Sequence, residues 1–225
     1  ARDDLNVSED GTYTFAVPVE RGDRYAVSVL SQPDNPTQTC TVNDGAGQVG
    51  RADITGVSVI CSTNSYLVGG TVSGLEGSGL VLQNNAGDDL GIDANGQFLF
   101  TVAVASGAGY AVTVKTQPAD LSQTCTVNNA SGTVTNADMN DVAVVCSTNS
   151  YQVSGTVSGL DGNGLVLQNN AGDDLGIDAD GQFTFATPVA SGAGYAVTVK
   201  AQPTDLSQTC TVNNASGTVT DADLN

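Results

Sequence analysis

Apolar residues alternate with polar or small residues along most of this chain, and this period of two predicts β-strands. The clearest example is the segment 109–115, in which Tyr110, Val112 and Val114 fall on one face of the expected strand. No stretch shows a helical period, so the expected fold class is all-β with no helix.

Between Tyr66 and Ser150 the alternation predicts about seven short antiparallel strands separated by turns. Asp93-Ala94-Asn95-Gly96 is typical of a β-hairpin turn, because Asn-Gly supplies the positive φ angles that tight turns require. Asn129–Gly132 predicts a further turn. This arrangement favours an immunoglobulin-like antiparallel β-sandwich, with a small closed barrel as the alternative. The expected core positions are Tyr66, Val68, Val72, Leu80, Leu82, Leu90, Ile92, Phe98, Phe100, Tyr110, Val112, Val114, Cys125, Val127, Val142, Val144 and Cys146.

The whole pattern recurs at a constant offset, which aligns Tyr25 with Tyr110. Residues 66–140 and 151–225 are identical at 62 of 75 positions without a gap. Such a period indicates tandem domains of about 85 residues. Few residues separate the last strand of one repeat from the first strand of the next, so we expect closely joined domains and a stiff array.

Three domains follow from this period: a first repeat (1–65), a second repeat (66–150) and a third repeat (151–225). By alignment the first repeat lacks about 20 leading positions and the third lacks about 10 trailing positions. The exposed sheet edges expected there invite pairing with strands from a longer chain or from a neighbouring chain.

The cysteines occupy repeat-equivalent positions, which are Cys40, Cys61, Cys125, Cys146 and Cys210. Cys40 and Cys61 have the same spacing as Cys125 and Cys146, and at that spacing the partner of Cys210 would fall beyond Asn225. One disulfide per repeat is expected, which indicates an oxidising compartment. Zinc ligation is the alternative, but two cysteines per repeat with no histidine cannot complete a zinc site.

The net charge of −18 is spread evenly over the repeats and disfavours nucleic acid and anionic membranes as partners, since both need Lys and Arg clusters. The absence of histidine excludes Ser–His and Cys–His nucleophiles. The two lysines, Lys115 and Lys200, are repeat equivalents, and Leu30 takes their place in the first repeat. We therefore expect no enzyme and no cofactor. No segment has the apolar length of a transmembrane helix or the pattern of a signal peptide.

Paired carboxylates at Asp88 and Asp89, with Asp93 and Asn95 close in sequence, leave two alternatives open. The oxygens could bind Ca²⁺, or they could serve ordinary turn chemistry, since the full alternation of acidic ligands in calcium loops is lacking. Three Asn-x-Ser sequences, at Asn6, Asn129 and Asn214, match the N-glycosylation pattern.

Together, the segments Gly70–Leu75, Gly79–Asn85, Gly96–Phe98, Gly109–Val114 and Gln123–Val127 resemble tandem Ig-like repeats of large secreted or surface-anchored bacterial proteins. The resemblance spans the whole chain and implies an extracellular structural or adhesive role. It transfers no functional residue, because the shared positions are turn, core and cysteine positions. We expect a self-associating structural subunit of an extracellular filament or surface fibre. The alternatives are an adhesin that binds a glycan or host surface, with or without Ca²⁺, and a spacer that carries a distant domain.

Overall fold

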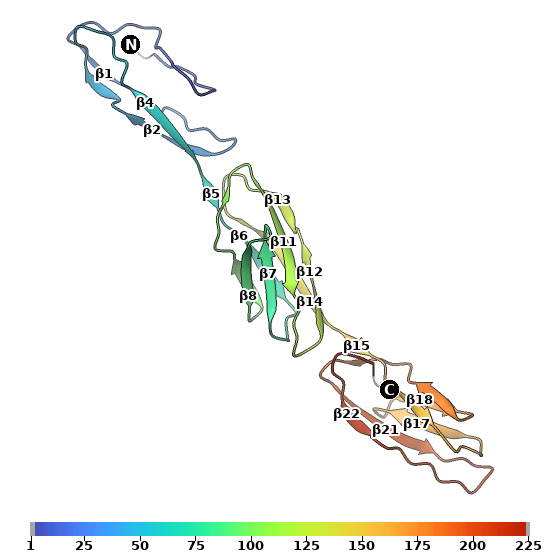
Figure 1. The fold of residues 1–225 in the computed structure, drawn as a ribbon. Helices are drawn as coiled ribbons and strands as arrows, with labels where there is room; N and C mark the ends of the chain where they lie inside the picture. Colours follow the sequence, from blue (N-terminus) through green and yellow to red (C-terminus); the bar gives the residue numbers. More distant parts are fainter. Residues whose placement is uncertain (1–2, 224–225) are drawn as a thin grey trace. The chain divides into compact units, whose positions relative to one another are not determined.

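A computed structural model describes residues 3–223, and these residues form β-strands and no helix (Figure 1). Among them there is accordingly no helix long and apolar enough to cross a membrane. The described residues divide into two compact units. The first unit comprises the described residues up to Tyr66 with Ala105–Ala108 and Thr133–Ala137, and the second comprises Leu67–Val104, Gly109–Gly132 and the described residues from Asp138 onward.

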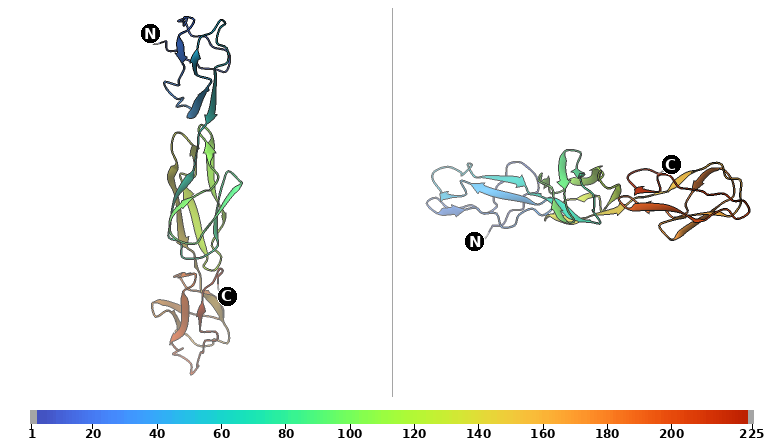
Figure 2. Two further views of the ribbon diagram at one scale, coloured as in Figure 1. Left: turned by 90° about the vertical axis from the view of Figure 1, so that its left-hand side faces the viewer. Right: turned by 90° about the horizontal axis from the view of Figure 1, so that it is seen from below.

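The second repeat is built from two four-stranded sheets, which lie in two layers (Figures 1 and 2). One sheet has the order β12-β14-β6-β9 and the other has the order β13-β11-β7-β8. The strands are β6 (Val68–Ser73), β7 (Leu80–Asn84), β8 (Asp88–Ile92), β9 (Gly96–Leu99), β11 (Gly109–Thr116), β12 (Gln123–Asn128), β13 (Ser131–Thr133) and β14 (Met139–Thr148), with a short pair formed by β5 (Ser65–Tyr66) and β10 (Val104–Ala105).

The core of the second repeat consists mainly of residues that alternation placed on inward faces. The rings of Phe98 and Phe100 pack edge to face with centroids 5.7 Å apart, an arrangement that aromatic pairs favour. The all-β pattern is therefore confirmed, and so are most of the expected inward positions. The buried apolar side chains are Val68, Val72, Leu75, Leu80, Leu82, Ile92, Phe98, Phe100, Val104, Tyr110, Val112, Cys125, Val134, Val142, Val144 and Cys146. Leu75, Val104 and Val134 were not among the expected core positions, and the expected Tyr66, Leu90, Val114 and Val127 are only partly buried.

One strand pair departs from the predicted antiparallel arrangement. β6 and β14 run parallel, with Val72 opposite Val144. The first and last long strands of the repeat are therefore neighbours in one sheet and point the same way. Alternation of apolar residues cannot reveal this, because it specifies the face of a strand and not the direction of its partner.

The predicted hairpin at Asp93–Gly96 is also wrong. β8 pairs with β7 and β9 pairs with β6, so this segment connects the two sheets. The Asn95 side chain accepts a hydrogen bond from the Leu75 amide at 2.8 Å and donates one to the Leu75 carbonyl oxygen at 2.9 Å. Asn-Gly chemistry thus sets the local turn, while the hydrogen bonds to Leu75 tie it to the other sheet. The structure also extends β13 into the turn predicted at Asn129–Gly132 and so exceeds seven strands.

The first repeat retains only part of this framework. Its strands form two separate pairs, β1-β3 and β2-β4, because the positions equivalent to the central strands β6 and β7 fall before residue 1. Val59 is consequently 39% exposed, whereas its equivalent Val144 is fully buried. The bounds are β1 (Arg24–Ala26), β2 (Gln38–Asn43), β3 (Ala46–Gln48) and β4 (Ser58–Thr63).

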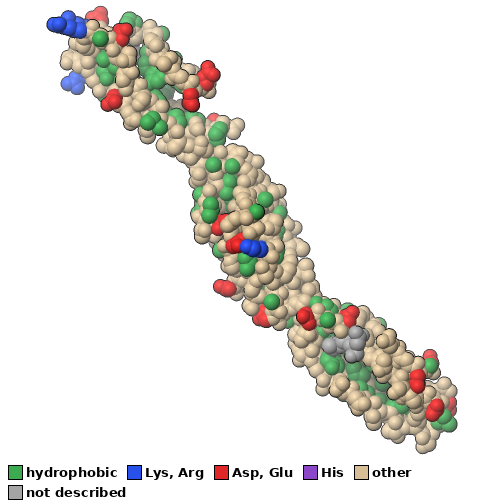
Figure 3. Space-filling view, viewed as in Figure 1, with side chains coloured by type: hydrophobic (Ala, Val, Ile, Leu, Met, Phe, Trp, Pro, Cys, Tyr) green, Lys and Arg blue, Asp and Glu red, His purple; other side chains and the backbone are tan. Residues whose placement is uncertain are grey.

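The third repeat keeps one complete sheet, with the order β18-β17-β21-β22, and a pair β16-β19. The position equivalent to the start of β14 is residue 224, outside the described residues. Residues 208–213, equivalent to β12, form no strand, and green apolar side chains are visible over this repeat in Figure 3. Its strands are β15 (Ser150–Tyr151), β16 (Ser154–Val157), β17 (Leu165–Asn169), β18 (Asp173–Ile177), β19 (Gly181–Thr184), β20 (Val189–Ala190), β21 (Gly194–Ala201) and β22 (Ser216–Thr218).

Candidate functional site at the junctions between repeats

Two disulfides link equivalent strands in the first and second repeats. Cys40 is bonded to Cys61 and Cys125 to Cys146, and each pair lies directly opposite in the ladder of the strands that carry it. Cys210 is a half-exposed free thiol. Because Cys40 and Cys125 pair with the strands equivalent to β14, the strand that would face Cys210 is the one that begins outside the described residues.

A glutamine side chain is hydrogen-bonded to the backbone of Cys40, Cys125 and Cys210, the first cysteine of each repeat. The Cys125 amide donates to Gln117 at 2.8 Å, and the Gln117 amide group donates back to the Cys125 carbonyl oxygen at 3.1 Å. The same pair of bonds joins Gln202 to Cys210 at 2.8 and 3.0 Å. Cys210 is therefore held by the same contacts as its disulfide-bonded equivalents, although it has no disulfide partner among residues 3–223.

The junction between the second and third repeats centres on Ser191, which is 6% exposed. Its hydroxyl oxygen accepts a hydrogen bond from the Ser122 amide at 3.1 Å, and its hydroxyl donates to the Thr220 carbonyl oxygen. The hydroxyl of Ser122 lies 2.6 Å from that of Tyr151, and its carbonyl oxygen accepts from the Asn149 amide at 2.9 Å. One buried serine thus links the Ser122 backbone of the second repeat to the Thr220 backbone of the third.

The junction that follows the first repeat has the same contacts at the equivalent positions. Ser106 accepts from the Thr37 amide at 2.9 Å and donates to the Thr135 carbonyl oxygen. The hydroxyls of Thr37 and Tyr66 lie 3.0 Å apart, and the Asn64 amide donates to Thr37 at 3.0 Å. All five residues belong to the first compact unit. Identical bonding at both places shows that the junction is repeated along with the fold.

A glycine follows each serine, and at Gly192 it lets the preceding repeat approach closely. A Cβ at Gly192 would lie 2.6 Å from the Leu121 side chain, and one at Gly107 would lie 3.4 Å from Pro36. Both glycines have positive φ angles, +80° and +85°, which other residues adopt rarely. In the third repeat the equivalent of Leu121 is Leu206, which is 51% exposed. The apolar contact at this position therefore depends on a following repeat.

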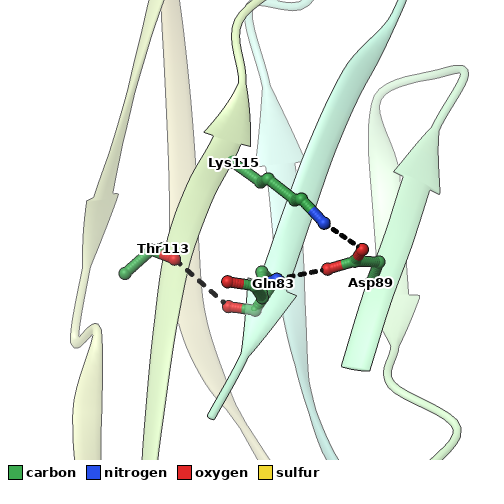
Figure 4. A network of polar contacts seen from close by, with 4 residues as sticks. All are labelled: Gln83, Asp89, Thr113 and Lys115. Atoms are coloured by element: carbon green, nitrogen blue, oxygen red, sulfur yellow. Dashed lines mark hydrogen bonds and ion pairs between the residues drawn. The ribbon is translucent and has the colours of Figure 1, made fainter. Parts of the chain in front are cut away.

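Asp88 and Asp89, two of the acidic residues considered for Ca²⁺, contact protein groups. Asp88 accepts a hydrogen bond from the Val102 amide at 2.9 Å. Asp89 forms an ion pair with Lys115 across the sheet and accepts a hydrogen bond from Gln83 at 2.6 Å (Figure 4). Residues 3–223 contain no group of three or more His, Cys, Asp or Glu side chains placed to hold a metal ion. The equivalent network of the third repeat comprises Asp174, Lys200 and Gln168.

Acidification is expected to disrupt the Asp89–Lys115 pair. The hydrogen bond from Lys115, followed by that from Gln83, lowers the pKa of Asp89 below its ordinary value of 3.8. A lowered pKa means that the pair contributes to stability above this value and that the contribution is lost as the pH falls through the lowered pKa. The loss of stability should be small because both side chains are exposed.

Replacing Lys115 should therefore raise the pKa of Asp89 toward its ordinary value. Carbon-13 NMR titration of the carboxyl groups in the Lys115→Met variant checks this. Asp120 is the internal control, because the Ser78 backbone amide lowers its pKa without Lys115. An Asp89 midpoint that stays unchanged in the variant would contradict the assignment.

The sequence indicates that the repeats are closely joined, but it does not single out the residues that join them. Ser106 and Ser191 stand in small-residue loops that look like ordinary turns. The one signal available was that the equivalent residue of the first repeat is Arg21, so this position differs among the repeats while the loop around it is similar. Comparison of the chain with models of known protein families and with curated proteins found no match.

Proposed function

We propose that this chain is a structural subunit of an extracellular filament or surface fibre, built by end-to-end packing of Ig-like repeats pinned by disulfides. The observation that carries the proposal is the recurrence of one hydrogen-bonded junction in consecutive repeats, centred on Ser106 and then on Ser191. A surface that contacts its neighbour in the same way each time produces an open assembly that does not close on itself.

The direction of the strands supports the same proposal. β6 begins the second repeat and β14 ends it, and the two run parallel. The chain therefore enters a repeat at one end of the sheet and leaves it at the opposite end, which is the connectivity that a linear array needs. Two disulfides in the described residues fit an oxidising environment, as expected for an extracellular protein.

Electron microscopy of the native assembly, with averaging along the fibre axis, tests this function. We expect continuous filaments whose density repeats at the spacing of one domain, with connected density at each junction. Short separate particles at micromolar concentration would overturn the proposal and favour the spacer or the adhesin, which a glycan-binding and calcium-binding screen would then distinguish.

The proposal includes the addition of a strand beside β16, which has one partner strand among the described residues. In the second repeat, Gly70 and Gly74 lie against the backbone of β14, where added Cβ atoms would overlap the carbonyl oxygens of Val142 and Cys146. These glycines are needed because β14 passes so close. Glycine at these two positions therefore indicates, from the sequence alone, that another strand packs closely there.

The third repeat keeps both glycines, as Gly155 and Gly159. A Cβ at Gly155 would lie 2.8 Å from the ring of Phe183, and Gly159 has no neighbouring atom within 4 Å of its added Cβ. β16 has one partner strand, β19, among the described residues. The third repeat thus retains the surface that accepts a strand like β14, with the Cys210 thiol beside it.

A peptide with the sequence of Met139–Thr148 should complete the third repeat. With its cysteine supplied as a mixed disulfide of thionitrobenzoate, the peptide forms a disulfide with the Cys210 thiolate and releases the thionitrobenzoate thiolate, which is measured by absorbance. We expect coupling that saturates with peptide concentration, because binding precedes the reaction. Amide hydrogen exchange in residues 208–213 should then slow, since these residues gain a ladder partner.

A peptide with both Val142 and Val144 replaced by Asp serves as the matched control, because it keeps the cysteine and loses the two side chains buried in the second repeat. It should couple at the rate of an unassisted thiol and leave the exchange of residues 208–213 unchanged. Equal rates for the two peptides would show that the third repeat has no strand-accepting surface.

A further inference from the structure

The buried serine at each junction has a hydrogen-bonding role that few side chains can fill. Ser191 must accept an N–H from Ser122 of the preceding repeat and donate to the Thr220 carbonyl oxygen of its own repeat. A hydroxyl can do both at once, because it offers one donor and two acceptor lone pairs. The two partners come from different repeats, so the hydroxyl fixes the direction in which one meets the other.

The contacts around this serine restrain the junction further. The Ser191 amide donates to the Asn149 carbonyl oxygen at 2.8 Å, and the Asn149 side chain donates to the Ser122 hydroxyl at 3.0 Å. Leu121 packs against Gly192 on the same side. The segment that connects the second and third repeats is therefore hydrogen-bonded to both of them. Rotation of the third repeat would break several of these hydrogen bonds together.

The first repeat offers an internal comparison at the same position. Arg21 is the equivalent of Ser106 and Ser191, and it is exposed. A guanidinium group carries donors and no acceptor, so it cannot receive the backbone N–H that Ser106 receives from Thr37. Its length also does not fit a position that is 6% exposed in the other repeats. The surface of the first repeat around Arg21 therefore cannot form the hydrogen bonds that Ser106 and Ser191 form.

We propose that Ser191 is a positioning residue that locks the angle between the second and third repeats, and that Arg21 marks a surface at which the contacts of this lock are absent. The inference rests on the proposed end-to-end packing and adds the residue that makes the packing rigid. The lock operates within a single chain, so it can be tested whether or not the chain assembles into filaments.

Residual dipolar couplings of the full chain, measured separately for amides of the second and third repeats, test the lock. In the unmodified chain one alignment tensor should fit both repeats. In Ser191→Ala the tensors should diverge, and the Ser122 amide should exchange about five to ten times faster because its acceptor is gone. Ser191→Arg, which copies the residue of the first repeat, should give a larger divergence.

The matched control is Ser216→Ala, an exposed serine in β22 of the same repeat. It should leave the common tensor and the Ser122 exchange rate unchanged. Unaltered amide shifts in the core around Val197 show that each variant is folded. Separate tensors in the unmodified chain, or a common tensor that survives Ser191→Ala with unchanged exchange, would overturn the lock. Absence of filaments by microscopy would instead overturn only the proposed function.

Discussion

Gly70→Ala is expected to destabilise the second repeat by about 3 kcal/mol or more, although it adds a single methyl group. The added Cβ would overlap the carbonyl oxygen of Val142, and backbone atoms in a paired strand cannot move aside as the end of a flexible side chain can. β6 and β14 would have to separate. Their pairing joins β12-β14 to β6-β9, so its loss divides the sheet.

Hydrogen exchange of the Val144 amide measures this effect in the intact chain, without assuming that all repeats unfold together. Gly91→Ala is the control, since Gly91 lies in β8 and a Cβ there meets no atom within 4 Å. The control should change stability by less than about 0.5 kcal/mol. If Gly70→Ala accelerated exchange no more than Gly91→Ala does, the close approach of β14 would be wrong.

Removing the disulfide of the second repeat with Cys125→Ala and Cys146→Ala is expected to cost about 3 kcal/mol. The bond joins cysteines with a sequence separation of 21, and breaking it restores the freedom of the loop between them in the unfolded chain. The loss is large for a domain of this size, because small domains bury only about 60% of their unfolded surface and have thin stability margins.

Exchange of the Leu82 amide reports this loss, because Leu82 lies in the sheet that does not carry the disulfide and so senses unfolding of the whole repeat. Cys210→Ala is the control, since it removes a thiol that forms no disulfide in the described residues. It should leave Leu82 unchanged. A double variant that exchanges at the same rate as the control would show that the disulfide does not stabilise the repeat.

Local residue patterns were sufficient to predict most of the strands and buried side chains of the second repeat. Leu80 and Leu82, or Phe98 and Phe100, are two positions apart and share a face, and each pair is buried as alternation predicts. Alternation could not indicate that β8 and β9 lie in different sheets, because an Asn-Gly turn has the same local chemistry whether or not the flanking strands pair. The long-range pairings show the separation: β8 pairs with β7, and β9 pairs with β6.

The sequence by itself determined that the chain is all-β, that it repeats at a constant interval and which side chains form most of the core of the second repeat. These properties depend on the alternation of apolar and polar residues and on the recurrence of the same sequence, and both can be read directly along the chain. Only the tertiary structure decided that β6 and β14 are parallel and that Ser106 and Ser191 close the junctions. Those contacts join residues far apart in the chain. The residues around a serine in a small-residue loop do not indicate that its hydroxyl accepts a hydrogen bond from a distant backbone amide.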